Sequence, residues 1–210
     1  MARMKFICDA NRCIECNGCV TACKNANEVP WGVNRRRVVT LNDGVPGERS
    51  VSVACMHCSD APCMAVCPVD CFVRSEDGVV LHDKDQCIGC GYCLYACPFG
   101  APQFPQAGAF GARGKMDKCT FCQGGPGKGS EEAQYSKYGQ NRVAAGKLPL
   151  CAEMCSTKAL LAGDGDVIAN IFRERVTVRG KGSEVIGWAT AYGRPGGASS
   201  GGAPAVEGKK

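Results

Sequence analysis

The sequence predicts an α+β fold of short hairpins and helices around a thin organic core, and three observations lead to this prediction. First, 18 of the 210 residues are cysteines, and most lie in closely spaced groups. Second, aromatic residues make up only 7%, and the hydrophobic fraction of 45% includes the cysteines. Third, two short extended runs flank an Asp-Gly turn between two of the groups, which indicates a hairpin. With so little apolar surface to bury, the cysteine groups must themselves hold the fold together.

Sixteen of the cysteines fall into four groups that have the spacing of iron–sulfur ligands. The first group is Cys13-x2-Cys16-x2-Cys19-x3-Cys23, and the third repeats this spacing as Cys87, Cys90, Cys93 and Cys97. The second group is Cys55, Cys58, Cys63 and Cys67, and the fourth is split into Cys119, Cys122, Cys151 and Cys155. Sixteen thiolates are enough for four [4Fe–4S] clusters, so the sequence predicts a carrier of electrons.

Two other uses of cysteine fit these spacings less well. A secreted disulfide scaffold would follow an apolar leader, which Met1–Cys8 lacks, and three cysteines on one tight loop are hard to pair. All-cysteine zinc sites usually join two separated pairs, so only the split fourth group resembles a zinc ribbon. No C-x-x-C pair is followed by histidine, as a c-type haem requires.

The second and third groups enclose the hairpin signal, in which Cys71–Arg74 and Val79–His82 flank a Ser-Glu-Asp-Gly turn. The order of ligand run, hairpin and ligand run is that of a bacterial two-cluster ferredoxin. We therefore expect two ferredoxin-like two-cluster modules, of which one is inserted into the other.

The inserted module is predicted at 51–109, and the outer module is split between 1–50 and 110–165. Met4–Ile7 and Ala159–Ala162 are the candidate strands of the outer module. They lie at its two ends, before the first cysteine group and after the fourth.

In two-cluster ferredoxins the last cysteine of each run ligates the other cluster. The three-residue spacer begins a helix that carries this thiolate away, and a proline after Cys67 and Cys97 shapes its departure by fixing φ. The same crossing predicts four ligand sets in this chain. The first set is Cys13, Cys16, Cys19 and Cys155; the second is Cys23, Cys119, Cys122 and Cys151; the third is Cys55, Cys58, Cys63 and Cys97; the fourth is Cys67, Cys87, Cys90 and Cys93.

The other segments are predicted from composition and periodicity. The Gly- and charge-rich stretch 123–149 is expected to be a surface loop with a short helix near Ser130–Tyr138. In 166–192 apolar residues recur at helical spacing, with Asp166 as N-cap and Gly180 as stop, before an extended segment. The Gly/Ala/Ser/Pro-rich tail 193–210 cannot bury enough to fold alone, and we expect it to run along a partner subunit.

Several residues near the groups have no predicted ligand role. Cys8 and Cys71 are left over and are expected to be small buried apolar side chains. His57, between Cys55 and Cys58, could hydrogen-bond near its cluster, or it could simply pack or face solvent.

Two further features are interpreted in the same way. His82 has no assigned role, and the run Arg35–Arg37 is expected to be a solvated face or a partner contact. The chain contains no Gly-rich phosphate loop, nucleophile–base pair or carboxylate dyad, so we expect a non-catalytic subunit.

The formal net charge of +5 does not predict a nucleic-acid partner. A [4Fe–4S] core with four thiolates carries about −2, so four of them would bring the holoprotein to about −3. The basic residues then mostly balance buried cluster charge. No stretch approaches the length of a transmembrane helix, so we expect no direct membrane span.

With the four groups in place, the chain resembles the iron–sulfur subunits of molybdopterin oxidoreductases over about residues 4–165. The segments Asp117–Cys122 and Leu150–Leu160 look most like the small (beta) subunit of formate dehydrogenase, of the compact type without a C-terminal membrane helix. The chain departs from anchored relatives in lacking that helix, and no proline follows Cys23 or Cys155.

The resemblance implies that electrons from formate oxidation at a molybdenum or tungsten centre in a large catalytic subunit pass through this chain. It also implies that the first set faces the catalytic subunit and the fourth set faces a cytochrome b membrane subunit or another acceptor. Because such subunits can be exported with a partner, both the cytoplasm and the periplasmic face of the inner membrane stay open. The alternatives are the electron subunit of a reductase-type molybdopterin enzyme and a free polyferredoxin.

Overall fold

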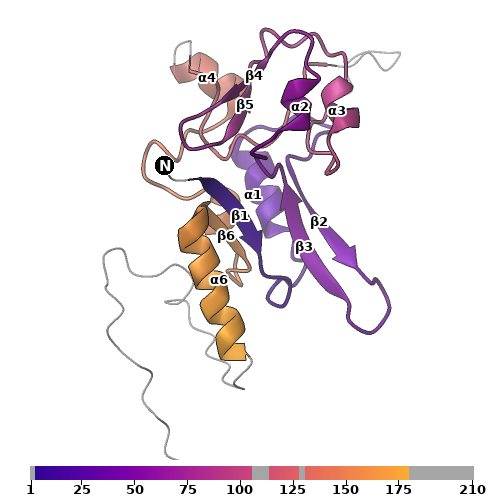
Figure 1. Ribbon diagram of the computed structural model, residues 1–210, viewed down its shortest axis with the longest axis vertical. Helices are drawn as coiled ribbons and strands as arrows, with labels where there is room; N and C mark the ends of the chain where they lie inside the picture. Colours follow the sequence, from indigo (N-terminus) through magenta and orange to yellow (C-terminus); the bar gives the residue numbers. More distant parts are fainter. Residues whose placement is uncertain (1–2, 106–113, 128–130, 180–210) are drawn as a thin grey trace, which may run out of the picture.

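The computed structural model describes residues 3–105, 114–127 and 131–179, and Figure 1 shows their arrangement. Short elements predominate, as expected for an α+β fold held by cysteine groups. The strands are β1 (Met4–Cys8), β2 (Arg36–Leu41), β3 (Arg49–Ala54), β4 (Phe72–Arg74), β5 (Val80–His82) and β6 (Leu160–Asp164). The helices are α1 (Gly18–Ala26), α2 (Pro62–Ala65), α3 (Tyr92–Ala96), α4 (Glu131–Tyr138), α5 (Leu150–Glu153) and α6 (Gly165–Arg179).

The first strand pairs with the last. β1 and β6 are antiparallel, in a register that runs from Met4 opposite Asp164 to Cys8 opposite Leu160. Both strands lie within a residue or two of the predicted runs, so this pair of predictions is confirmed. The pairing brings the segment before the first cysteine group next to the segment after the fourth (Figure 1).

The predicted hairpin between the second and third cysteine groups is present as β4 and β5, with Phe72 opposite His82. Its turn is closed by the backbone N–H of Ser75, which donates to the carbonyl of Val79 at 2.9 Å. Gly78 has φ +73°, a left-handed conformation that glycine adopts without steric cost. The Asp-Gly signal therefore located this turn correctly.

A second hairpin, β2–β3, is not among the predicted elements. Arg36 lies opposite Ala54 and Leu41 opposite Arg49, and the hairpin projects from the body of the protein in Figure 1. In β3 the buried positions are Ser50, Ser52 and Ala54, while the valines between them are only half-buried. The buried face of β3 therefore carries small and polar side chains. The alternation of apolar and polar residues that usually marks a half-buried strand is for this reason hidden in the sequence.

The predicted C-terminal helix is present as α6, but its N-cap differs from the prediction. Asp164 Oδ1 accepts hydrogen bonds from the backbone N–H groups of Asp166 at 2.9 Å and Val167 at 3.2 Å. Asp164, not Asp166, therefore satisfies the first free donors of the helix. The predicted stop at Gly180, the extended segment that follows it and the tail 193–210 lie outside the described residues.

α6 packs on the β1–β6 pair through Ile168 and Ile171, which are buried against Leu161 and Ile7. The helix lies along these strands in Figure 1. None of the helices in the described ranges has the length and apolarity needed to cross a membrane.

The insert 123–149 contains the predicted short helix, α4, but it is not purely a surface loop. The side chain of Tyr138 is fully buried, and its hydroxyl accepts a hydrogen bond from the backbone N–H of Lys84 at 2.8 Å. The ring of His82 meets that of Tyr138 edge-on, at 5.4 Å between centroids. The end of α4 is therefore anchored to the segment that follows β5.

The interior consists of several small clusters in which cysteines take the place of larger apolar side chains. One cluster surrounds Phe121 and contains Cys19, Cys23 and Cys151 with Leu81 and Leu160. A second surrounds Met116 and contains Cys63, Cys71 and Cys93. Because cysteines form much of these two clusters, the organic core is thin, as composition predicts.

Candidate iron–sulfur cluster sites

The third predicted set lies around one cavity. Cys55, Cys58 and Cys63 from the second cysteine group line it together with Cys97, the last cysteine of the third group. Cys63 is on α2 and Cys97 directly follows α3, and these two short helices pack against each other. The structure thus brings together four cysteines that the crossing rule assigns to one cluster.

The fourth predicted set lies around a neighbouring cavity. Cys87, Cys90 and Cys93 line it together with Cys67, the last cysteine of the second group. Phe104 and Met116 supply apolar walls. Cys71 also borders this cavity, with its Sγ 3.5 Å from that of Cys67.

The second predicted set includes one cysteine on α1 and one on α5, and these two helices pack against each other. Cys23 is on α1 and Cys151 on α5, and both belong to the core cluster around Phe121. Burial raises the pKa of Cys23 to about 12, and the nearby thiolates of Cys151 and Cys122 add to the rise. Burial likewise raises the pKa of Cys119, with Cys23 and Cys151 as like-charged neighbours. All four members of this set therefore lie near one another.

The first predicted set is closest to the surface. Cys16 is exposed, and Cys13 and Cys155 are partly so. Cys155 packs against the core cluster that contains Cys19. Burial raises the pKa of Cys19, and the nearby charges of Cys151 and Cys155 add to the rise. The loop that carries Cys13 and Cys16 is shaped by left-handed conformations at Glu15 and Asn17, with φ of 58° and 55°.

Backbone N–H groups point at several sulfurs of the predicted ligand sets. Phe121 N–H donates to Cys119 Sγ at 3.3 Å, and Met116 N–H donates to Cys87 Sγ at 3.4 Å. Leu160 N–H donates to Cys155 Sγ at 3.5 Å. Such hydrogen bonds stabilise a thiolate and raise the potential of a cluster bound to it.

The electrostatics of the thiols fit a cationic iron core. Burial raises the pKa of Cys63 to about 11 and that of Cys93 to about 12, and neighbouring thiolates contribute to both. The pKa of Cys87 is instead lowered to about 5, chiefly because the Cys71 thiol donates to it. Thiolates gathered in this way repel one another, so a metal core that neutralises them would stabilise the sites.

Within the described ranges, no three His, Cys, Asp or Glu side chains converge closely enough to hold one metal ion. The four thiolates of a [4Fe–4S] cluster bind four separate irons, so the cysteines of one set need only surround its core.

The two leftover cysteines differ in their surroundings. Cys71 is buried at the edge of the fourth-set cavity, as described above. Cys8 is only partly buried, and its Sγ accepts a hydrogen bond from the backbone N–H of Ser52 at 3.2 Å.

His57 is buried, so of its three predicted environments solvent exposure is wrong. Its Nδ1 accepts a hydrogen bond from Val80 N–H at 3.1 Å and lies 3.9 Å from Cys55 Sγ. Burial lowers the pKa of His57 well below its usual range, and the charge of Lys118 lowers it further. The ring is therefore a neutral packing element beside a ligand of the third set.

The arginine run was predicted to be a solvated face or a partner contact, and this is wrong for two of its three residues. Arg35 and Arg36 are buried. Arg35 binds Asp117 through both carboxylate oxygens, at 2.6 and 3.0 Å, and Lys84 Nζ lies 2.9 Å from Asp117 Oδ2. Asp117 thus pairs with two cations that come from distant parts of the chain.

Sequence reasoning also missed a buried lysine beside the third set. Lys118 is fully buried, lines the third-set cavity, and donates to the carbonyls of Val80 and Cys119. Its only signal in the sequence is its position directly before a cysteine of the fourth group.

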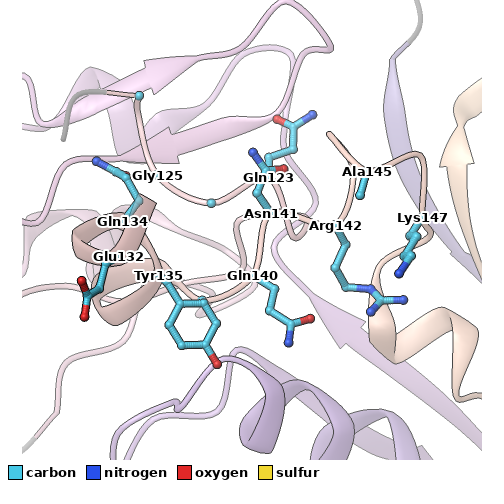
Figure 2. A pocket seen from close by; sticks show the side chains of 13 residues that line it. Gln123, Gly125, Glu132, Gln134, Tyr135, Gln140, Asn141, Arg142, Ala145 and Lys147 are labelled. Atoms are coloured by element: carbon cyan, nitrogen blue, oxygen red, sulfur yellow. The ribbon is translucent and has the colours of Figure 1, made fainter. Parts of the chain in front are cut away.

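An open pocket without cysteines lies over the insert (Figure 2). Glu132 and Tyr135 of α4 border it on one side, and Asn141, Arg142 and Lys147 border it on the other. Its lining is mostly amides, glycines and charged groups, with no pairing of a nucleophile and a base among the residues that form it. It is therefore distinct from the cysteine cavities.

Comparison with known proteins agrees with this chemistry. The family described as the 4Fe-4S dicluster domain matches residues 49–165. The formate dehydrogenase iron-sulfur subunit of Wolinella succinogenes is 66% identical over 194 residues, which cover 91% of this chain and 97% of that protein.

Two reductase subunits are more distant relatives. The thiosulfate reductase electron transfer subunit of Salmonella typhi is 38% identical over 161 residues, covering 74% of this chain and 72% of the relative. A subunit of the anaerobic dimethyl sulfoxide reductase of Escherichia coli is 35% identical over 172 residues, covering 77% of this chain and 73% of the relative.

Proposed function

This chain belongs to the 4Fe–4S dicluster domain family, and from this membership we propose that it is the electron-transfer subunit of a formate dehydrogenase. It receives electrons released by formate oxidation at a molybdenum- or tungsten-pterin centre of a large subunit and delivers them to a downstream acceptor. The observation that carries the choice of formate is the 66% identity to a formate dehydrogenase iron-sulfur subunit, over nearly the whole of both chains. The reductase subunits are much less similar, at 38% and 35% identity.

We propose that the sixteen cysteines hold four [4Fe–4S] clusters in the four crossed sets defined above. The support is that the third and fourth sets each line one cavity, and that each cavity takes one cysteine from the other group. The packing of α1 on α5 supports the second set, and the nearness of Cys155 to Cys19 supports the first.

The same observations support the proposed insertion of one two-cluster module into another. β1 and β6 close the outer module, and β4 and β5 form the hairpin of the inserted one. Figure 1 shows α2, α3, β4 and β5 grouped at one end of the protein, with β1, β6 and α6 toward the other.

A bound [4Fe–4S] cluster supplies reversible one-electron redox chemistry. The chain contributes the rest: cysteines that hold each core, apolar walls such as Phe104 and Met116 that exclude water, and N–H groups aimed at sulfur. Helix α1 carries Cys19 of the first set and Cys23 of the second, which keeps these two sites close. The similarity to a formate dehydrogenase iron-sulfur subunit supports a non-catalytic role for this chain.

Exposed apolar side chains support two partner-facing surfaces. Ile14 and Met154, beside the first set, are exposed, as are Ile88, Tyr92 and Tyr95 beside the fourth set. We propose that the first surface meets the large catalytic subunit and the second meets a cytochrome b or another acceptor. Exposed apolar patches of this kind are typical of protein contacts.

Formate should reduce the clusters of the chain in its native complex. We expect anaerobic addition of formate to bleach the cluster absorption and to produce the EPR signals of reduced clusters, while acetate at the same concentration does neither. If formate leaves the clusters oxidised, and thiosulfate or dimethyl sulfoxide reoxidises a chemically reduced complex, the chain serves a reductase instead. Elution of the native chain alone in gel filtration would favour a free carrier.

A further inference from the structure

Arg36 on β2 is a buried cation without an acidic partner. Its side chain is 2% exposed, and its guanidinium lies over the ring of Phe6, with Cζ 4.3 Å from the ring centroid. Nη1 donates to Ser52 Oγ at 3.0 Å. Nε and Nη2 are buried, and neither has a hydrogen-bond partner among the described residues. A buried guanidinium with two unpaired N–H groups is costly unless something compensates its charge.

The neighbouring arginines show that this situation is particular to Arg36. Arg35 is also buried, but its Nε and Nη2 both donate to the carboxylate of Asp117. Arg37 is only partly buried and donates to the carbonyls of Phe99 and Gly100. In the described part of the chain, no carboxylate forms an ion pair with Arg36.

The groups around Arg36 are cysteine sulfurs of two predicted ligand sets. Phe6, which lies against the guanidinium, packs on the core cluster that contains Cys19, Cys23 and Cys151 and on a smaller cluster that contains Cys119. Burial alone would lower the pKa of Arg36, but attraction to these four cysteines raises it. Three of these cysteines belong to the second set, and Cys19 belongs to the first. Ser52 Oγ, which accepts from Arg36, is also 3.2 Å from Cys19 Sγ, so this hydroxyl links the guanidinium to a ligand of the first set.

We propose that Arg36 is the counter-cation shared by the clusters of the first and second sets, and that it raises their reduction potentials. Its unpaired Nε–H and Nη2–H groups are the donors available to sulfur, while Phe6 and Ser52 hold the plane of the guanidinium. A reduced cluster carries one more negative charge than an oxidised one, so a fixed cation and its hydrogen bonds stabilise the reduced form. Arg36 is thus a positioning and tuning residue, and this role rests on the proposed ligand sets.

The test is a redox titration of the full-length chain, isolated anaerobically with its clusters and followed by EPR. The signals are first assigned with serine variants of cysteines from the first and second sets. In Arg36→Gln we expect the potentials of both of these clusters to fall, each by about 59 mV, a tenfold change for one electron. The potentials of the third and fourth sets stay unchanged. Arg37→Gln, the matched control, leaves the potentials of the first and second sets unchanged.

A second variant keeps the test decisive if Arg36→Gln fails to retain its iron. Arg36→Lys keeps the charge but lacks the planar fork of donors, so the same potentials should fall by a smaller amount. Unchanged potentials in every Arg36 variant that keeps its iron would overturn the proposal. An equal shift of all four potentials, or the same shift in Arg37→Gln, would also overturn it. The titration uses chemical reductants and does not depend on formate. If formate fails to reduce the protein, the proposed formate dehydrogenase function is contradicted, but the measured effect of Arg36 on the potentials still holds.

Discussion

Replacing Cys23 by serine should perturb the same cluster as replacing Cys122 by serine, although the two residues are far apart in the sequence. Cys23 is the last ligand of the first cysteine group, and α1 carries it to the side of α5 and Cys122. Each variant should lose or alter one cluster, with up to about four of 16 irons missing. EPR of the reduced variants checks this, because both should change the same signal and leave the Cys13 cluster unaffected.

Cys71→Ala and Cys8→Ala are the matched controls, since both remove a thiol that lies close to a ligand set. Cys71 borders the fourth-set cavity, and Cys8 accepts a hydrogen bond from Ser52. Both variants should retain all four clusters, because neither cysteine belongs to a set. Loss of different EPR signals in Cys23→Ser and Cys122→Ser would contradict the crossed ligation. Loss of iron in a control would show that the removed cysteine is itself a ligand.

Asp117→Ala should destabilise the protein more than any other charge substitution in the described residues. The Asp117 side chain is 1% exposed and pairs with Arg35 at 2.6 Å and with Lys84 at 2.9 Å. Removing it leaves two cations without their acid, at a cost of about 3–5 kcal/mol for a broken buried pair. Lys84 also donates to the carbonyl of Lys137, and Arg35 to that of Tyr138. The substitution therefore weakens the junction between β2, the segment after β5, and α4.

Asp85→Ala is the control for Asp117→Ala, because it removes a solvent-exposed acid that pairs with Lys137 at 2.5 Å. Such surface pairs contribute little to stability. The measurement is the guanidinium concentration at which cluster absorption is half lost under anaerobic conditions. We expect a clearly lower midpoint for Asp117→Ala and an unchanged midpoint for Asp85→Ala. Equal midpoints for the two variants would show that the buried ion network does not hold these segments together.

The elements that the sequence predicted correctly are those with strong local signals. The hairpin β4–β5 is marked by an Asp-Gly turn between two apolar runs, and α6 by its helical periodicity. The spacing of the cysteines also predicts four ligand sets; the third and the fourth set each line one cavity, and the ligation itself stays a prediction. In each case the pattern lies within a few residues, or follows a rule of ligand spacing.

The features that escaped prediction depend on partners that are distant in the sequence. Arg35 is buried because Asp117 lies beside it, and no local pattern relates these two residues. β3 buries Ser50 and Ser52, whose hydroxyls bind Glu15 and Arg36, so its inward face does not look hydrophobic. Arg36 is buried among thiolates, and a charged residue in such surroundings looks like a surface residue in the sequence.

The central claim is that sixteen cysteines of this chain hold four [4Fe–4S] clusters, and metal analysis tests it most directly. Iron and acid-labile sulfide should be measured on the anaerobically isolated full-length chain, together with zinc. The account predicts about 16 iron and about 16 sulfide per chain, with no stoichiometric zinc. About 12 iron per chain, or one zinc per chain, would contradict it and would point to the split group of Cys119, Cys122, Cys151 and Cys155 as a site of another kind.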